Sequence, residues 1–171
     1  MFDPGQELAK GCRRLGRVLF EQVKQGSADS ALILEGLIHG YLRRFSFEKA
    51  LVCQEALLKL EPGNIQALLW RGRMRATLKH RSGAREDFET ALKLVPQFAA
   101  ARYYLCELLL NTNQFHDAET HLKILNEQVA ENLNVRLLWA RCRIAMGDDA
   151  GGRQLLDLWL ADVPPDRKSV V

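Results

Sequence analysis

The sequence predicts an all-α solenoid, in which pairs of antiparallel helices stack one after another. Two sets of residues that recur every 34 positions lead to this fold. Small residues form the first set: Ala50, Ala84, Ala118 and Gly152. The second set holds prolines, with one alanine in the intervening place: Pro62, Pro96, Ala130 and Pro164. A period of this length is typical of a helix–turn–helix repeat.

Each recurring set has a steric reason. Antiparallel helices approach closely only where small side chains lie at their crossing point, as Gly72 and Ala84 do in one repeat. Pro62 and Pro96 end helices, because proline lacks the helical N–H and disfavours the α conformation in the residue before it. We therefore expect first helices over 31–44, 65–78, 99–112 and 133–146. We expect second helices over 47–60, 81–94, 115–128 and 149–162.

These repeats resemble those of the tetratricopeptide repeat (TPR) family, whose unit is a 34-residue helix–turn–helix. The stretch IQALLWRGRMRATLKHRSGAREDFETALKLVP matches best, through Gly72, Ala84, Phe88, Ala91 and Pro96. The family's usual tryptophan near the start of the unit is replaced in all four repeats, by Leu34, Leu68, Arg102 and Arg136. The resemblance implies a right-handed superhelix of about four repeats, at 31–64, 65–98, 99–132 and 133–164.

The two ends of the chain lie outside this pattern. Within residues 1–30, an apolar residue every third or fourth position predicts one more amphipathic helix, near 5–24. This helix either covers the first repeat or continues the array as half of an earlier one. Residues 165–171 form a polar tail, and Leu155, Leu158 and Trp159 give the last helix an apolar face. Because a solenoid end normally needs a polar cap, we expect a longer array or a contact there.

Composition excludes several classes of protein. The net charge is +3, with 47% apolar and 26% charged residues, as in ordinary soluble proteins. No apolar stretch approaches the roughly 18–20 residues that span a bilayer, and the N-terminus does not read as a signal peptide. We therefore expect a cytoplasmic protein with no membrane partner.

The four cysteines, Cys12, Cys53, Cys106 and Cys142, are scattered and lie among apolar neighbours. They are expected to be buried thiols in a reducing compartment, and we predict no metal and no cofactor.

The TPR resemblance implies a concave groove that is lined by one strip of each first helix. A strip at spacings of three and four residues stays within about 80° of the helix surface. The predicted groove residues are Leu32, Glu35, His39, Arg43, Gln66, Leu69, Arg73, Thr77, Tyr103, Glu107, Asn111, Leu137 and Arg141.

The stretch LLWRGRMRATLKHRSGA, residues 68–84, carries five lysines and arginines and no acid. Among them, Arg73 is expected to face the groove, and Lys79 and Arg81 to lie in a turn. Arg71 and Arg75 fall where helices pack, so they should pair with acids, because an unpaired buried charge is unfavourable. The candidate acids are Glu55, Glu86 and Glu89. Since these cations scatter around the helix, nucleic acid is an unlikely partner.

No residue pattern indicates catalysis. His116 and His121 are five residues apart and do not share a helix face, unlike a zinc-binding pair. His39 has no nucleophile or acid partner implied by spacing. Residues 147–152, GDDAGG, lie in a helix–helix turn and not after a strand, so they do not form a phosphate loop.

The leading hypothesis is a non-enzymatic scaffold that binds a partner peptide, partly acidic, in the groove. A clamp for chaperone C-termini is disfavoured, because Glu35, His39, Trp70, Ala100 and Tyr104 do not match the lysines, asparagines and arginine that such TPR domains use. One alternative is a structural or self-associating segment of a longer array. Another is an accessory domain of an enzyme or of a nucleic-acid complex.

Overall fold

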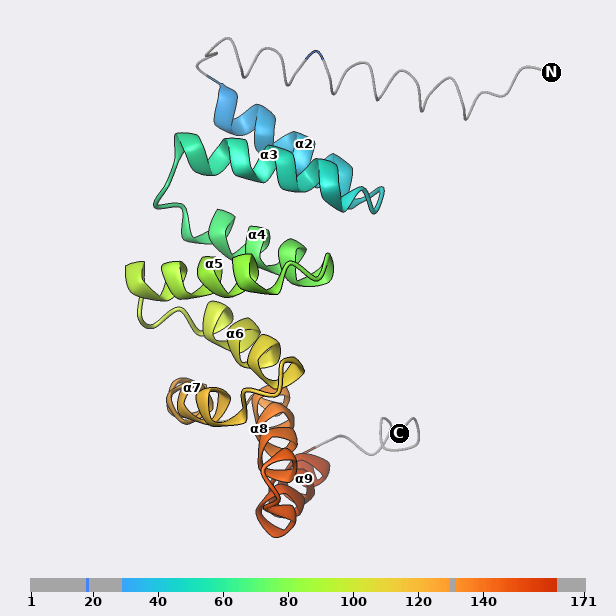
Figure 1. The fold of residues 1–171 in the computed structure, drawn as a ribbon, viewed down its shortest axis with the longest axis vertical. Helices are drawn as coiled ribbons and strands as arrows, with labels where there is room; N and C mark the ends of the chain where they lie inside the picture. The colour runs from blue at the N-terminus through green and yellow to red at the C-terminus, as the bar shows by residue number, and fades with distance from the viewer. Residues whose placement is uncertain (1–17, 19–28, 130–131, 163–171) are drawn as a thin grey trace, which may run out of the picture. The chain divides into compact units, whose positions relative to one another are not determined.

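The computed structural model describes residue 18, residues 29–129 and residues 132–162 of the chain. Within these residues the labelled elements are all α-helices (Figure 1). They are α2 (Ser30–Leu42), α3 (Phe47–Leu60), α4 (Ile65–Thr77), α5 (Arg81–Leu94), α6 (Ala99–Asn111), α7 (Phe115–Gln128), α8 (Leu133–Ala145) and α9 (Asp149–Asp162). The all-α helical repeat fold is therefore confirmed.

The chain divides into two compact units. The N-terminal unit, Met1–His80, contains α2, α3 and α4, and the C-terminal unit, Arg81–Val171, contains α5 to α9. Within the N-terminal unit, α2 packs along α3, and α3 packs on α4 (Figure 1). Within the C-terminal unit, each helix packs on the next, and α6 also contacts α8. The contact between α6 and α8 brings two first helices side by side.

The four second helices begin and end at the predicted residues, whereas the first helices end one or two residues early. The reason is a shared turn in which one residue has a positive φ. These residues are 34 apart: Phe45 (53°), Lys79 (65°), Asn113 (59°) and Gly147 (88°). The next residue in each turn donates its N–H to a carbonyl five residues back, as from Ser46 to Tyr41 at 2.9 Å and from His80 to Arg75 at 2.8 Å. Backbone geometry, and not one side-chain type, therefore closes these turns.

The recurring small residues lie in the core. Ala50, Ala84 and Ala118 have no exposed surface, and Gly152 is buried with them. The predicted burial of cysteines is confirmed for Cys53, Cys106 and Cys142, and Cys12 lies outside the described residues. Burial raises the pKa of the Cys53 thiol to about 11 and that of Cys106 to about 12. These thiols stay protonated at neutral pH, as packing residues would.

In the third repeat, Arg102 occupies the place of the family's usual tryptophan, and its side chain is 7% exposed. Its Nη2 donates a hydrogen bond to the carbonyl oxygen of Pro96, and its Nη1 lies 3.3 Å from Nδ1 of His121. Partial burial and the nearby Arg102 charge both lower the pKa of His121. His121 is therefore a half-buried packing neighbour of a cation.

Several predictions fall on parts of the chain that the structure does not describe. They are the helix near 5–24, the tail 165–171, and the side chains of Leu158 and Trp159. No helix among the described residues is long and apolar enough to cross a membrane.

Candidate functional site

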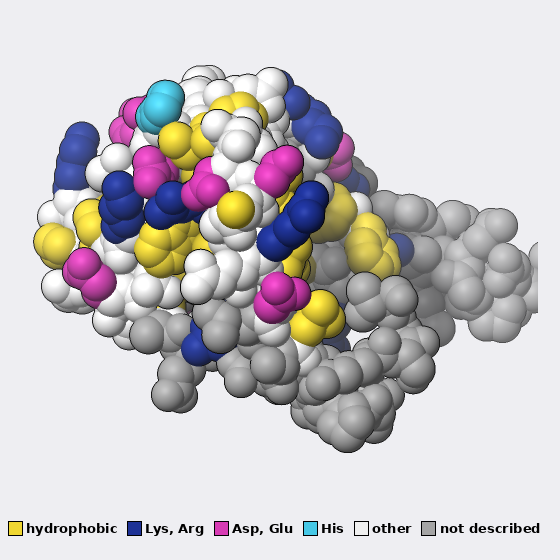
Figure 2. All heavy atoms as spheres, turned by 90° about the horizontal axis from the view of Figure 1, so that it is seen from below, with side chains coloured by type: hydrophobic (Ala, Val, Ile, Leu, Met, Phe, Trp, Pro, Cys, Tyr) yellow, Lys and Arg dark blue, Asp and Glu magenta, His cyan; other side chains and the backbone are white. Residues whose placement is uncertain are grey.

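The basic side chains of residues 68–84 lie in different environments. Arg75 is half-buried, and its Nη2 lies 3.3 Å from Oε1 of Glu55, which confirms the predicted pairing for this residue. The guanidinium of Arg73 lies over the indole ring of Trp70, 4.4 Å from its centroid. Glu89, another candidate acid, instead pairs with Arg85 at 2.6 Å. On the face drawn in Figure 2, acidic and basic side chains are interspersed and do not gather by sign.

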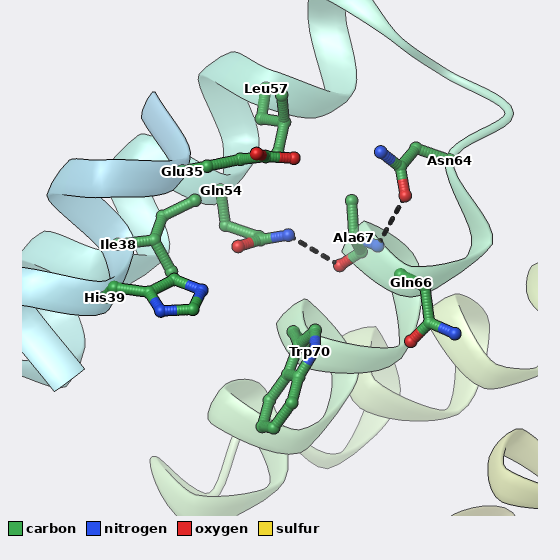
Figure 3. A pocket seen from close by; sticks show the side chains of 9 residues that line it. All are labelled: Glu35, Ile38, His39, Gln54, Leu57, Asn64, Gln66, Ala67 and Trp70. Carbon is green, nitrogen blue, oxygen red and sulfur yellow. Dashed lines mark hydrogen bonds between the residues drawn. The ribbon is translucent and has the colours of Figure 1, made fainter. Parts of the chain in front are cut away.

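Three predicted groove residues meet around one hollow in the N-terminal unit (Figure 3). Glu35 and His39 reach it from α2, and Gln66 reaches it from α4. The hollow has a volume of about 340 Å³. Its other lining residues are Ile38, Gln54, Leu57, Asn64, Ala67 and Trp70. The site therefore combines an apolar interior and one aromatic ring with a polar rim, a composition typical of ligand-binding pockets.

The buried amide of Gln54 lies within this hollow. Gln54 is 3% exposed, and its Nε2 donates a hydrogen bond of 2.9 Å to the carbonyl oxygen of Ala67, which ties α3 to the first turn of α4. Figure 3 shows the amide oxygen turned away from that bond, toward the side of Ile38. No described residue donates a hydrogen bond to this oxygen. It remains available as an acceptor inside the hollow.

Asn64 fixes where α4 begins and so positions the α4 side of the hollow. Its Oδ1 accepts a hydrogen bond of 2.9 Å from the N–H of Ala67, as a helix N-cap does. Its Nδ2 donates one of 2.8 Å to Oε2 of Glu61. Because the helix begins at a defined residue, the positions of Gln66 and Trp70 around α4 are fixed.

The remaining strip residues of the N-terminal unit differ in how accessible they are. Leu32 is 69% exposed, and Arg43 is exposed. Thr77 is exposed as well, although its hydroxyl bonds to the carbonyl oxygen of Arg73 at 3.0 Å. Leu69 departs from the prediction, because it is 6% exposed. It packs inside and is not an exposed anchor.

In the C-terminal unit, the strips of α6 and α8 lie together. Nη2 of Arg141 donates a hydrogen bond of 3.4 Å to Oδ1 of Asn111. Burial, followed by the nearby Glu107 carboxylate, raises the pKa of the Tyr103 phenol. Leu137, on the same strip of α8, is exposed. Tyr103, Glu107, Asn111 and Arg141 therefore lie near one another.

Trp70 and Gln54 were not predicted as site residues. Trp70 lies about 20° outside the arc that defines the strip, at 100° per residue, so a slightly wider arc includes it. Gln54 belongs to a second helix, where the strip argument does not apply. A glutamine at a place that other repeats fill with Phe88 or Leu122 is the signal that points to it.

No group of three or more histidine, cysteine, aspartate or glutamate side chains that could hold a metal ion occurs in the described part of the chain. What the arrangement offers is hydrogen bonding, charge and apolar surface, which are the elements of recognition.

Comparison with known proteins shows which solved folds and which family model the chain resembles. The fold is that of solved helical-repeat proteins. One is a tetratricopeptide repeat protein from Parabacteroides merdae ATCC 43184 (TM-score 0.80, 19% identity), with 88% of this chain and 60% of that one covered. Another is MamA 41-end from Desulfovibrio magneticus RS-1 (TM-score 0.74, 22% identity), with 78% of this chain and 76% of that one covered. At these identities the likeness shows the fold alone.

A third similar structure contains a peptide. It is the first TPR of Spaghetti (RPAP3) bound to the HSP90 peptide SRMEEVD, with a TM-score of 0.66 and 16% identity. The match covers 71% of this chain and 96% of the Spaghetti chain.

The family model described as tetratricopeptide repeat matches residues 37–110. This stretch is therefore similar to the tetratricopeptide repeat, in agreement with the likeness in fold. No curated protein sequence matches the chain. The chain spans 60% of the length of the Parabacteroides merdae protein.

Proposed function

We propose that this chain is a non-enzymatic scaffold that binds a partner peptide segment along the strips of its first helices. One observation carries the proposal: predicted strip residues lie together in each unit. Glu35, His39 and Gln66 surround one hollow, and Asn111 bonds to Arg141. The similar Spaghetti structure, which holds an HSP90 peptide, supports the same use of this fold.

The partner segment carries some negative charge and some apolar side chains. Arg43, Arg73 and Arg141 belong to the strips and offer guanidinium groups, which recognise carboxylates in bidentate geometry. Leu32 and Leu137 are exposed on the same strips and offer apolar contacts. An extended peptide could satisfy both kinds of group.

A random nonapeptide display on the immobilised chain tests this function. We expect enriched sequences on the wild type, and a loss of enrichment on a variant with Arg73→Glu and Arg141→Glu. The matched control carries Lys59→Glu and Arg153→Glu, which reverse one exposed cation on a second helix of each unit and should leave enrichment intact. A wild-type chain that enriches no sequence, or a control that loses as much as the test variant, would contradict the proposal.

A further inference from the structure

The hollow of the N-terminal unit has an unequal distribution of charge and of hydrogen-bonding groups. Glu35 is the carboxylate among its lining residues, and none of the described residues that line it is a lysine or an arginine. Figure 3 shows Glu35 extending from α2 over the hollow. Deeper in, Gln54 presents an amide oxygen to which no described residue donates. A ligand that fills this space must therefore supply donors, and preferably a positive charge.

The walls between these acceptors are apolar or aromatic. Ile38, Leu57 and Ala67 supply aliphatic surface, and Trp70 supplies an indole ring. A wholly apolar occupant would remove water from Glu35 and from the Gln54 oxygen without replacing it, which is unfavourable. A long aliphatic stem that ends in a cation satisfies the walls and the acceptors together.

The Trp70 ring already attracts a guanidinium within this protein. Arg73, one turn further along α4, lies 4.4 Å from the ring centroid, although it is not among the residues that line the hollow. An exposed indole is the side chain that best binds a cation through its π face. The intramolecular contact shows that this ring is accessible to such a group.

We propose that this hollow binds the side chain of a lysine or arginine of the partner peptide. The aliphatic stem lies against Trp70 and Leu57, and the cationic end is shared by the Glu35 carboxylate and the Gln54 amide oxygen. This inference rests on the proposed function and specifies one residue of the partner. The acidic residues of the same peptide face arginines such as Arg43, which lies two turns beyond Glu35 along α2, or about 12 Å at 1.5 Å per residue.

The nonapeptide display, repeated on Glu35→Gln and Glu35→Arg, tests this assignment separately from the function. We expect wild-type sequences to share a lysine or arginine, Glu35→Gln to lose that preference, and Glu35→Arg to select an acid in its place. Glu48→Gln removes an exposed carboxylate that does not line the hollow, and it should select as the wild type does. Because Glu35 is exposed, these changes should leave the melting temperature near that of the wild type.

A double-mutant cycle then measures the pair directly. A selected peptide is compared with a version in which norleucine replaces its lysine, on the wild type and on Glu35→Gln. We expect each single change to weaken binding roughly 2- to 5-fold, as for a partly exposed ion pair, and the two together to weaken it no further. Trp70→Leu should weaken binding of the lysine peptide by a similar factor.

The outcomes separate the two proposals. Enriched peptides without a shared base, or a base preference that survives Glu35→Gln, would overturn the inference and leave the scaffold function standing. A norleucine peptide that binds the wild type as tightly as the lysine peptide would also overturn it. A wild-type chain that enriches nothing would overturn both.

Discussion

The two units place different residue pairs at equivalent sites. In the N-terminal unit, Gln54 of α3 and Trp70 of α4 line the hollow. Each equivalent residue lies 34 positions later, at Phe88 and Tyr104 in the C-terminal unit, where the rings stack with centroids 6.2 Å apart. The same positions one repeat further hold Leu122 and Leu138, which are both buried. The first pair lines a hollow, the second pair stacks its rings, and the third pair is buried in the core.

The comparison teaches how one repeat of this fold can hold a hollow where the next repeat holds an aromatic pair. Phe88 contributes its whole ring to the interior, where it is fully buried. Gln54 is equally buried but turns its amide toward Ala67, because a buried amide needs a hydrogen-bond partner. An amide aimed at the backbone does not fill the space that a ring would, and the hollow is the result.

The largest effect on stability should come from removing the ring of Phe88, one member of the stacked aromatic pair. We expect Phe88→Ala to lower the free energy of unfolding by about 3–5 kcal/mol, since the side chain is fully buried and leaves a cavity. Urea unfolding followed by circular dichroism measures the change. Phe45→Ala is the control, because Phe45 is exposed, and it should change stability far less. Equal losses would show that burial does not distinguish the two rings.

The shared turns should show the next largest effect. Gly147→Ala places a side chain at φ 88° and should destabilise the protein by about 1–2 kcal/mol. Lys79→Gly removes the side chain from the residue that has the equivalent positive φ in another repeat. This change should stabilise the protein by about 0.5–1 kcal/mol. Thermal unfolding of both variants gives the signs. Two shifts of the same sign would contradict the view that backbone conformation governs these turns.

A smaller effect on stability is expected at the hollow itself. Gln54→Leu keeps the size of the side chain but removes its hydrogen bond to Ala67, so the free energy of unfolding should change by no more than about 1 kcal/mol. The same variant should lose the base preference in peptide display. A loss as large as that of Phe88→Ala would mean that Gln54 serves the core and not the site.

The contacts of Arg85 on the surface of the C-terminal unit should contribute still less to stability. Arg85 bonds to Glu89 and Gln114, both at 2.6 Å, and lies 3.7 Å from Asp117. Its side chain is well exposed, so Arg85→Ala should lower the free energy of unfolding by only about 0.5 kcal/mol, and by less in high salt. Unfolding at low and at high salt tests this, and a loss that does not depend on salt would contradict the ionic explanation.

The smallest expected effect is a pH dependence from His121. Its pKa is lowered in the folded protein, so the unfolded chain binds the proton more readily and the folded state is disfavoured by protonation. Stability should therefore be full above the ordinary histidine pKa of about 6.5 and fall as the pH drops through it. Melting temperatures of His121→Gln should vary less between pH 7.5 and 5.5. His116→Gln changes an exposed histidine of the same helix and should follow the wild type.

Residues whose role depends on local geometry could be predicted from the sequence. The buried Ala84 and Ala118 follow from the period, and the pairing of Arg75 with Glu55 follows from the unfavourable burial of an unpaired charge. The strip argument named Glu35 and His39 as groove residues, and both line the hollow. It failed at Leu69, because a helical wheel gives the direction of a side chain and not what packs on it.

The sequence alone determined the repeat, since a 34-residue period of small residues and prolines dictates where helices cross and end. Only the tertiary structure decided where the array is hollow. The space beside Gln54 depends on side chains from α2, α3 and α4 together, and on which way one buried amide turns to satisfy its N–H. Packing of that kind joins residues that are far apart in the chain, so no local pattern encodes it.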